Sequence, residues 1–372
     1  MIRVGINARV LGKPEMEGVI RYTRELLDAL AALEADRPPG ERAFRYLLFG
    51  VDAVPDPLRG YDAIRCADEP APTHSGPRAH LWEQTTLPRA VSRHDVDVFH
   101  TPAGNPPLGA GVPQVTTIHD ISPVTHPEWF SWGYAALYRT MIPFAVRRSD
   151  RIITVSRFSR DELVAEYPRA GGKTVSVHNG HEPPDADASH SVPGLDEQPF
   201  LLSVASDNPR KNLDGLLAAY REYRERVDDP ASLVLVGPTR EIFAGGGVEA
   251  GDGVETLGFV SDDRLDWLYH YASAFAFPSL YEGFGLPILE AMSAGTPVVT
   301  ADRGAMAEVA DGAACRVDPT DVDALADGIE RVLHDPAYRA EIVDRGRDRA
   351  TAFTWGRTAR ATADVYRAAA EE

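Results

Sequence analysis

Two carboxylates and two adjacent cations in the C-terminal half have the residue types and the spacing to hold a phosphorylated ligand. Glu282 and Glu290 stand eight residues apart in the stretch YEGFGLPILEAMSAG. Arg210 and Lys211 lie about seventy residues earlier, in a turn between an expected strand and an expected helix. An ammonium and a guanidinium suit a diphosphate, the first as a point charge and the second as a fork of donors. A solvated basic turn is the plain alternative for this pair.

The glycine-rich loop of the same stretch would let an anion approach the backbone. Gly283 and Gly285 flank Phe284, and Leu286 leads into a helix expected over Ile288–Ala294. Glycine allows close approach, and backbone N–H groups at a helix N-terminus attract anions. The loop therefore predicts main-chain contacts to a phosphate.

Glu290 has two interpretations. Pro287 is well placed at the first position of the helix, which puts Glu290 in the first turn. A carboxylate there can accept paired hydrogen bonds from a ribose diol, as an acidic residue does in dinucleotide sites. Alternatively, Glu290 only complements the helix dipole, an effect worth about 0.3–1 kcal/mol.

A histidine marks a further position in the N-terminal half. His119 directly follows the apolar run Val115–Ile118. Because open α/β sheets bind ligands at the carboxyl ends of their strands, His119 could line a reaction centre. A hydrogen-bonded structural histidine is the commoner explanation for a single His at a strand end.

These residues need a scaffold, and the chain alternates apolar runs with helical stretches. In the first half, strands are expected at Ile2–Ile6, Tyr46–Phe49, Val96–Phe99, Val115–Ile118, Arg151–Val155 and Thr174–Val177, with helices at Ile20–Leu33 and Tyr134–Arg148. In the second, strands are expected at Phe200–Val204, Leu233–Val236, Val254–Phe259, Phe275–Phe277 and Pro297–Thr300, with helices at Leu213–Val227, Asp262–Tyr271 and Ile288–Ala294. Such alternation predicts parallel sheets covered by helices on both faces.

A proline-rich stretch without apolar periodicity separates the two halves. It predicts an N-terminal domain over 1–182, a linker over 183–199 and a C-terminal domain over 200–354. A chain of 372 residues is long enough for two such domains. We therefore expect two Rossmann-like halves with a cleft between them.

Composition disfavours several classes of protein. The formal net charge of −18 disfavours nonspecific binding to nucleic acid or anionic lipid. Cys66 and Cys315, one in each half, argue against a disulfide framework, and neither has a partner at metal-ligand spacing. The acidic, arginine-rich composition is compatible with a GC-rich genome or with a salt-rich cytoplasm.

The sequence predicts a cytoplasmic protein with at most peripheral membrane contact. No apolar run approaches the roughly 20 residues that a membrane span needs, and the start MIRVGINARV lacks the pattern of a signal peptide. The aromatic residues Trp82, Trp129, Phe130 and Trp132 could stack on a sugar or lie against a membrane surface. Buried packing is the commoner fate of such side chains.

Several motifs occur in a recognisable order. PRKN follows a strand, and EGFGLPILEAMSAGTPVV, with a Glu-x7-Glu pattern, follows about seventy residues later. NARVLGKPEMEGVIRYTRELLDAL, TTIHD, ITVSRFSRDEL and VHNG precede them, and FTWGRTARATADVY comes last. Over nearly its whole length the chain resembles the family 4 glycosyltransferases, a retaining group with the GT-B fold. The likeness is closest to bacterial and archaeal mannosyltransferase-like members.

The resemblance implies an α/β protein of GT-B fold, with two Rossmann-like domains facing each other across a cleft and a terminal helix near 355–372 that packs back on the first domain. It implies that Lys211, helped by Arg210, neutralises a donor diphosphate, and that Glu290 holds the ribose hydroxyls. Catalytic roles fall on His119, near the transferred sugar, and on Glu282. Further donor contacts are implied for Gly18, Gly283, Phe284, Gly285 and Leu286.

Two stretches depart from the family's pattern. Glu17-Gly18-Val19-Ile20 stands where the family often carries two or more glycines, which puts close approach through that loop in doubt. Ala205-Ser206 replaces the common Gly followed by a polar or basic residue. Arg210 is therefore the one arginine expected to serve the diphosphate.

The implied reaction is transfer of a hexose, of mannose type and from GDP-mannose, with retention at the anomeric carbon. The acceptor is a glycan, a lipid-linked sugar or a small molecule, and the oligomeric state stays open. No metal and no cofactor are expected. A GT-A metal site needs Asp-x-Asp just after a strand, but Asp95-Val96-Asp97 precedes a strand and Asp321-Val322-Asp323 begins a helix.

Other functions share the same fold and diphosphate site. A UDP- or dTDP-sugar could be the donor instead. From other classes, the chain could be a GT-B epimerase of a UDP-sugar or a non-catalytic sugar-nucleotide-binding subunit. The set of Lys211, Glu282, Glu290 and His119 favours catalysis over the last of these.

Overall fold

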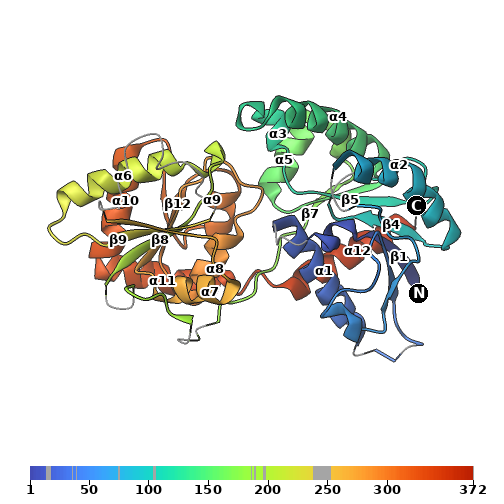
Figure 1. The fold of residues 1–372 in the computed structure, drawn as a ribbon, viewed down its shortest axis with the longest axis horizontal. Helices are drawn as coiled ribbons and strands as arrows, with labels where there is room; N and C mark the ends of the chain where they lie inside the picture. Colours follow the sequence, from blue (N-terminus) through green and yellow to red (C-terminus); the bar gives the residue numbers. More distant parts are fainter. Residues whose placement is uncertain are drawn as a thin grey trace. The chain divides into compact units, whose positions relative to one another are not determined.

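The structure is a computed structural model that describes residues 1–13, 18–35, 37–38, 40–73, 76–103, 106–185, 187, 190–195, 198–237 and 253–371. Glu17, in the expected N-terminal loop, lies outside these ranges. The chain forms two compact units, Met1–Gly180 with Thr354–Glu372, and His181–Phe353 (Figure 1). Cys66 and Cys315 lie one in each unit, and neither is in a disulfide.

The described residues of the first unit form a seven-stranded parallel sheet in the order β3-β2-β1-β4-β5-β6-β7. Its strands are β1 (Ile2–Asn7), β2 (Phe44–Phe49), β3 (Ile64–Cys66), β4 (Val98–Thr101), β5 (Gln114–Ile118), β6 (Arg151–Thr154) and β7 (Thr174–Ser176). Its helices are α1 (Gly18–Ala35), α2 (Gly76–Arg93), α3 (Ser122–Thr125), α4 (Trp132–Arg148), α5 (Arg157–Glu166) and α12 (Trp355–Ala370).

Helices cover both faces of this sheet, because neighbouring strand residues point to opposite sides. Phe99 of β4 packs with Phe49 and with Trp82 of α2 in one cluster. The next residue, His100, faces the other side and contacts Tyr366 of α12. The C-terminal helix α12 also packs along α1, so the end of the chain completes the first unit.

The described residues of the second unit form a six-stranded parallel sheet in the order β10-β9-β8-β11-β12-β13. Its strands are β8 (Phe200–Val204), β9 (Ser232–Val236), β10 (Val254–Gly258), β11 (Ala274–Phe277), β12 (Val298–Ala301) and β13 (Cys315–Val317). Its helices are α6 (Leu213–Arg226), α7 (Asp262–Tyr271), α8 (Leu286–Ala294), α9 (Gly304–Ala310), α10 (Val322–His334) and α11 (Pro336–Ala350).

Apolar side chains again fill both faces of the sheet. Leu216 of α6 and Ile329 of α10 share one buried cluster with Leu201 of β8. On the opposite face, Phe200 stacks on Trp267 of α7 at a ring-centroid separation of 6.4 Å. Each unit thus carries a doubly covered parallel sheet, as the alternation of strands and helices predicts.

The two short strands β3 and β13 were not predicted. Each is three residues long, IRC and CRV, and each stands at an edge of its sheet. A three-residue run has too few positions to show an alternation of buried and exposed side chains. The strand Phe200–Val204 has the predicted bounds, and the other expected strands differ by one or two residues at their ends, as boundaries commonly do.

Gly180 is the last residue of the segment Met1–Gly180, and its backbone lies directly against the start of α12. A Cβ atom at this position would overlap the backbone nitrogen of Trp355. Gly180→Ala is therefore expected to lower the free energy of unfolding by about 3 kcal/mol or more, the upper range for overpacking. Gly133→Ala is the control, since a Cβ there meets nothing within 4 Å. Equal urea midpoints for the two variants would contradict this account of the contact.

Candidate active site

Lys211 and Glu282 form an ion pair in the second unit. The Lys211 Nζ donates to Glu282 Oε1 at 2.6 Å. It also stands 4.8 Å from the centroid of the Phe277 ring. Burial alone would raise the pKa of the Glu282 carboxyl, but the attraction of Lys211 and Arg210 outweighs it and holds that pKa below its usual value. The pair therefore sets a cation and an anion side by side after two strands, β8 and β11.

The main chain ties the two parts of this pair together. Leu280 N donates to the carbonyl of Arg210 at 2.7 Å. The side chain of Asn208 accepts from Arg210 N at 3.1 Å and so closes the turn. The basic turn after β8 is thus attached to the loop after β11 and is held in shape by its own residues.

Asn212 connects the basic turn to other loops of the second unit. It precedes α6 as a cap residue would, but its side chain accepts no capping hydrogen bond. Its amide instead donates to the carbonyls of Pro278, at 3.1 Å, and Pro319, at 2.6 Å. Its φ of 55° is left-handed, a conformation that Asn tolerates better than most residues. Asn212 therefore joins the Lys211 turn to two distant loops.

The glycine loop presents its backbone, not a large side chain. Gly285 stands at the cap of α8 with a φ of 115°, which favours glycine. Phe284 is buried and packs edge-on against Phe353, with ring centroids 5.8 Å apart. Leu286 is the first residue of α8. If the loop from Gly283 to Leu286 contacts a phosphate, the main chain would therefore make those contacts.

The expectation that Glu290 lies in the first turn of its helix is wrong. Because α8 begins at Leu286, Glu290 is its fifth residue. The side chain is 5% exposed, and its Oε2 accepts a hydrogen bond from the Tyr269 hydroxyl at 2.9 Å. A buried, hydrogen-bonded carboxylate beyond the first turn does little for the helix dipole, whose effect is confined to that turn. These observations favour the interpretation that Glu290 binds a ligand over the one in which it complements the helix dipole.

Tyr269 was not predicted, since nothing in the local pattern of α7 distinguishes it from a core tyrosine. Tyr269→Phe is expected to raise the donor KM by roughly 10-fold or more, because the lost hydrogen bond goes to a carboxylate and such bonds are worth about 1.5–3 kcal/mol. Turnover at saturating donor should change little. Tyr220→Phe is the control, since its hydroxyl donates to the carbonyls of Ala231 and Gly253 in the core of the second unit. Steady-state kinetics of both variants tests the assignment, and equal KM changes would contradict it.

His119 lies in the first unit, directly after β5. Its Nε2 donates to the carbonyl of Pro102 at 2.9 Å, which leaves Nδ1 as the acceptor in a neutral ring. The ring of Tyr22 packs edge-on against it at a centroid separation of 4.7 Å. Burial lowers the pKa of His119 below its usual value, although the Pro102 carbonyl and Asp120 act in the opposite direction. His119 is therefore neutral at pH 7.

A buried polar chain lies behind His119. Tyr22 OH and Thr117 Oγ1 are 3.2 Å apart, and Thr117 Oγ1 is 2.9 Å from His100 Nε2. His100 Nδ1 in turn lies 2.7 Å from the Tyr366 hydroxyl. Burial lowers the pKa of His100 to about 3, so its ring is neutral as well. The sequence offered no signal for this chain, which joins α1, β4, β5 and α12.

Gly18 is the first residue of α1 and is exposed. A Cβ at this position would meet nothing within 4 Å, so packing among the described residues does not require glycine there. The contact of Gly18 with a ligand stays a prediction.

The described residues contain no group of three or more His, Cys, Asp or Glu side chains that could hold a metal ion. Asp97 Oδ2 accepts from Arg3 N ahead of β4, and Asp321 caps α10, so both Asp-x-Asp triplets have other local roles. No described helix is long and apolar enough to cross a membrane.

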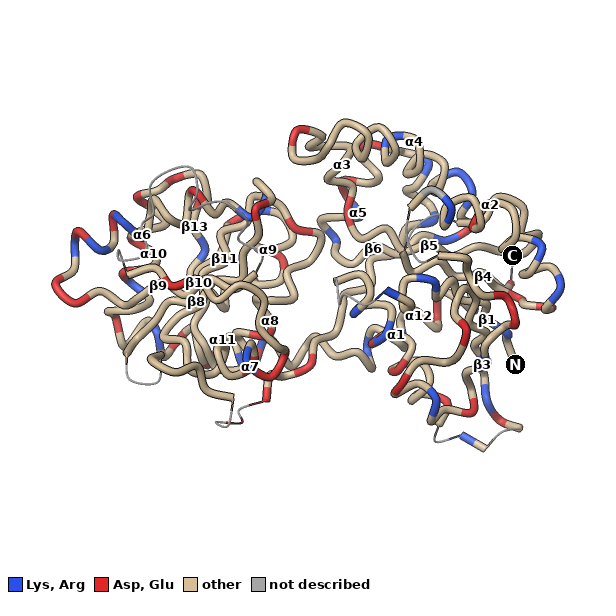
Figure 2. Tube along the Cα trace, viewed as in Figure 1, with Lys and Arg blue, Asp and Glu red and all other residues tan. Residues whose placement is uncertain are grey.

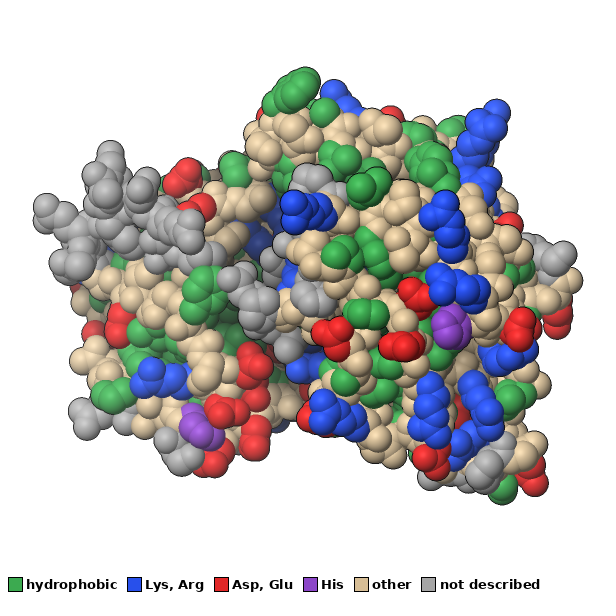
Figure 3. All heavy atoms as spheres, turned by 45° about the vertical axis from the view of Figure 1, so that its right-hand side comes forward, with side chains coloured by type: hydrophobic (Ala, Val, Ile, Leu, Met, Phe, Trp, Pro, Cys, Tyr) green, Lys and Arg blue, Asp and Glu red, His purple; other side chains and the backbone are tan. Residues whose placement is uncertain are grey.

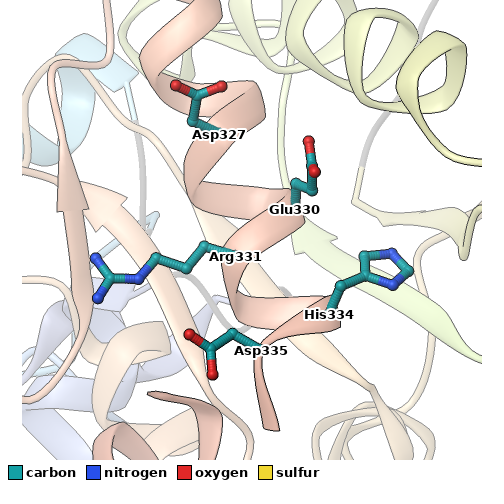
Figure 4. A pocket seen from close by; sticks show the side chains of 5 residues that line it. All are labelled: Asp327, Glu330, Arg331, His334 and Asp335. Atoms are coloured by element: carbon teal, nitrogen blue, oxygen red, sulfur yellow. The ribbon is translucent and has the colours of Figure 1, made fainter. Parts of the chain in front are cut away.

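A pocket lies along the C-terminal part of α10 (Figure 4). It is lined by Asp327, Glu330, Arg331, His334 and Asp335. The Arg331 guanidinium lies over the Tyr338 ring at 3.6 Å, and His334 Nε2 bonds to the Tyr223 hydroxyl at 3.0 Å. Because these groups already have protein partners, the pocket offers little to a phosphate.

The two units, each a parallel sheet covered by helices, have the GT-B fold, and solved structures of glycosyltransferases match it over the full chain. A sucrose-phosphate synthase from Thermosynechococcus elongatus matches with a TM-score of 0.74 at 23% identity, covering 99% of this chain and 98% of that one. HepE from Anabaena, solved in complex with UDP-glucose, matches with a TM-score of 0.66 at 19% identity, covering 99% and 100%. At these identities the likeness shows the fold alone.

Family models and relatives agree. Residues 16–183 match the model of Glycosyltransferase Family 4, and residues 185–349 match that of Glycosyl transferases group 1. The chain is 32% identical over 275 residues to O-antigen chain mannosyltransferase B of Escherichia coli, covering 68% of this chain and 70% of that protein. It is 32% identical over 307 residues to MMP alpha-(1->4)-mannosyltransferase of Mycolicibacterium hassiacum, covering 74% and 72%. The chain belongs to the family 4 glycosyltransferases.

Proposed function

We propose that this glycosyltransferase moves a mannose-type hexose from GDP-mannose to a hydroxyl of a glycan, lipid-linked or small-molecule acceptor, with retention and without a metal. The observation that carries the donor site is the Lys211–Glu282 pair, tied by Arg210 and Asn212 to the loop that opens α8. The mannose assignment is supported by relatives named as mannosyltransferases, two of them 32% identical.

The donor is held at its diphosphate and at its ribose. Lys211 and Arg210 neutralise the diphosphate, and the backbone from Gly283 to Leu286 donates to it at the N-terminus of α8. Glu290 accepts from the ribose hydroxyls while Tyr269 holds its other oxygen. Glu282 keeps the Lys211 ammonium in position next to the diphosphate and the sugar.

Leaving-group stabilisation dominates the chemistry. The bond between the anomeric carbon and the diphosphate oxygen breaks, and the sugar gains oxocarbenium character while negative charge grows on the diphosphate. Lys211 and Arg210 meet that charge in a pre-arranged turn, the type of electrostatic stabilisation that costs no reorganisation during the reaction. The acceptor oxygen bonds to the same face of the sugar, and its proton passes to the departing diphosphate.

His119 acts in this scheme as a neutral hydrogen-bonding group near the transferred sugar. His119→Ala is expected to lower kcat by about 10- to 150-fold with the donor KM nearly unchanged, because one hydrogen bond to a group that gains charge is worth about 1.5–3 kcal/mol. His100→Ala is the comparison, because its buried ring bonds to Thr117 and Tyr366 and its loss should act first on stability. An unchanged kcat for His119→Ala would remove the catalytic role.

The experiment that tests the function is a transfer assay in EDTA with GDP-mannose and a panel of mannoside acceptors. We expect a new α-mannoside with the anomeric configuration of the donor, identified by NMR. Transfer from UDP- or dTDP-sugars only would overturn the donor assignment. Conversion of the donor sugar without acceptor would indicate an epimerase, and tight donor binding without any transfer would indicate a binding subunit.

A further inference from the structure

The segment 129–149 differs in charge from the rest of the chain. It contains Arg139, Arg147 and Arg148 and no carboxylate, although Glu128 and Asp150 stand directly before and after it, in a chain whose formal net charge is −18. Most of the segment is the helix α4, which Figure 2 draws in blue and tan only. The acidic surface that disfavours binding to anionic lipid is therefore interrupted at α4.

The same helix exposes large apolar side chains. Trp132 is 87% exposed, the highest value among the large hydrophobic residues that the structure describes, and Tyr134 and Leu137 are each 42% exposed. The buried side of α4, with Ala135 and Ile142, faces the core of the first unit. On the face that Figure 3 shows, exposed hydrophobic and basic side chains lie beside one another. The outward face of α4 is thus apolar and basic together.

Hydrogen bonds and ring stacking support the exposed side chains of α4. Ser131 caps α4 by accepting from Tyr134 N. Tyr134 stacks between Phe130 and Tyr138, with centroid separations of 5.4 and 4.5 Å. At the other end of the helix, Arg148 donates to the carbonyl of Leu108, another exposed apolar residue. The helix therefore holds Trp132 outward on a packed support.

We propose that the outward face of α4 is a docking surface for an anionic lipid bilayer. Tryptophan favours the boundary between headgroups and acyl chains, and arginines beside it attract anionic lipids. A sugar platform fits less well, because a side chain that is 87% exposed has almost no protein wall around it to enclose a small ligand. The surface lies outside the donor site and does not depend on the donor that the enzyme uses.

The test is flotation of the full chain with vesicles of phosphatidylcholine alone or mixed with phosphatidylglycerol. We expect binding to the mixed vesicles, weakened by salt, and little binding to the neutral ones. Trp132→Ser should reduce binding by about tenfold through lost apolar burial, and Arg147→Ala by roughly fivefold. Phe259→Ser is the matched control, since Phe259 is 82% exposed on the second unit next to Asp262 and Asp263.

Three outcomes would overturn the proposal. Wild-type protein that does not float with the anionic vesicles, or equal losses for Trp132→Ser and Phe259→Ser, would remove the lipid surface. A dimer without lipid that dissociates in Trp132→Ser would assign α4 to a second copy of this chain instead. Transfer to a water-soluble acceptor should be the same in Trp132→Ser and wild type, which separates a failure of docking from a failure of the proposed reaction.

Discussion

Lys211→Ala is expected to weaken binding of the sugar nucleotide by roughly 10- to 150-fold, because a hydrogen bond to a charged group is worth about 1.5–3 kcal/mol. The effect should appear in the Kd for the free nucleoside diphosphate as well as for the full donor, since the ammonium serves the diphosphate. Calorimetric titration measures both. Lys173→Ala is the matched control: its Nζ donates to the Ser149 carbonyl at 2.6 Å in the first unit, and donor binding should be unchanged.

Loss of Lys211 also leaves the Glu282 carboxylate without its closest partner, which would lower stability whatever the site does. The double variant Lys211→Ala with Glu282→Gln separates the two effects, because the amide carries no charge to leave unpaired. We expect the double variant to recover stability but not donor affinity. If its donor affinity returned together with its stability, Lys211 would be a structural cation and the proposed diphosphate site would be wrong.

Glu83→Ala is expected to lower the free energy of unfolding of the first unit by about 3–5 kcal/mol, the cost of breaking a buried ion pair from one side. Glu83 of α2 is completely buried. Its Oε1 accepts from Arg9 Nε and Nη2 at 3.0 and 2.9 Å and from Asn7 Nδ2 at 3.0 Å. Hydrogen exchange of β1 and α2 amides in urea measures the effect in the unit where the pair lies.

Glu222→Ala is the control for Glu83→Ala, since Glu222 pairs with Arg226 on the exposed side of α6 at 3.1 Å. Exposed pairs at this spacing contribute only about 0.3–0.5 kcal/mol. If both variants lost the same free energy of unfolding, the buried pair would stabilise the protein no more than an exposed one.

The Glu83 pair also predicts a pH dependence. Burial raises the pKa of Glu83, but hydrogen bonds from His80 and Asn7 and the charge of Arg9 outweigh it and hold the pKa below the ordinary value of 4.5. The folded state therefore favours the carboxylate. The contribution of Glu83 to the free energy of unfolding is complete above about pH 5 and is lost as the pH falls through the lowered pKa.

Periodicity predicted the core of both sheets because parallel strands buried on two faces form continuous apolar runs. It missed β3 and β13, whose three residues carry no period. The start of α8 was misplaced because Pro287 was taken as its first residue, whereas the left-handed Gly285 lets the helix begin at Leu286. Glu290 consequently lies deeper in the helix than spacing suggested.

The partners of the site residues depended on contacts that no local pattern contains. The Asn212 side chain bonds to the carbonyls of Pro278 and Pro319, which are 66 and 107 residues further along the chain. Asn directly before a helix is typical of an N-cap, so its residue type and place do not indicate these bonds. Tyr269 meets Glu290 from another helix. Residue types and order were sufficient to nominate Lys211, Glu282 and Glu290, and the fold was needed to find what positions them.

The central claim is that the second unit holds the diphosphate of a sugar nucleotide at Lys211, Arg210 and the loop before α8. Calorimetric titration in EDTA with GDP, UDP and dTDP, each against its nucleoside, tests it most directly. The account predicts that one diphosphate, GDP first among them, binds at least tenfold more tightly than its nucleoside, the effect of about one charged hydrogen bond. Equal affinities for diphosphate and nucleoside, or no binding of any diphosphate, would contradict it.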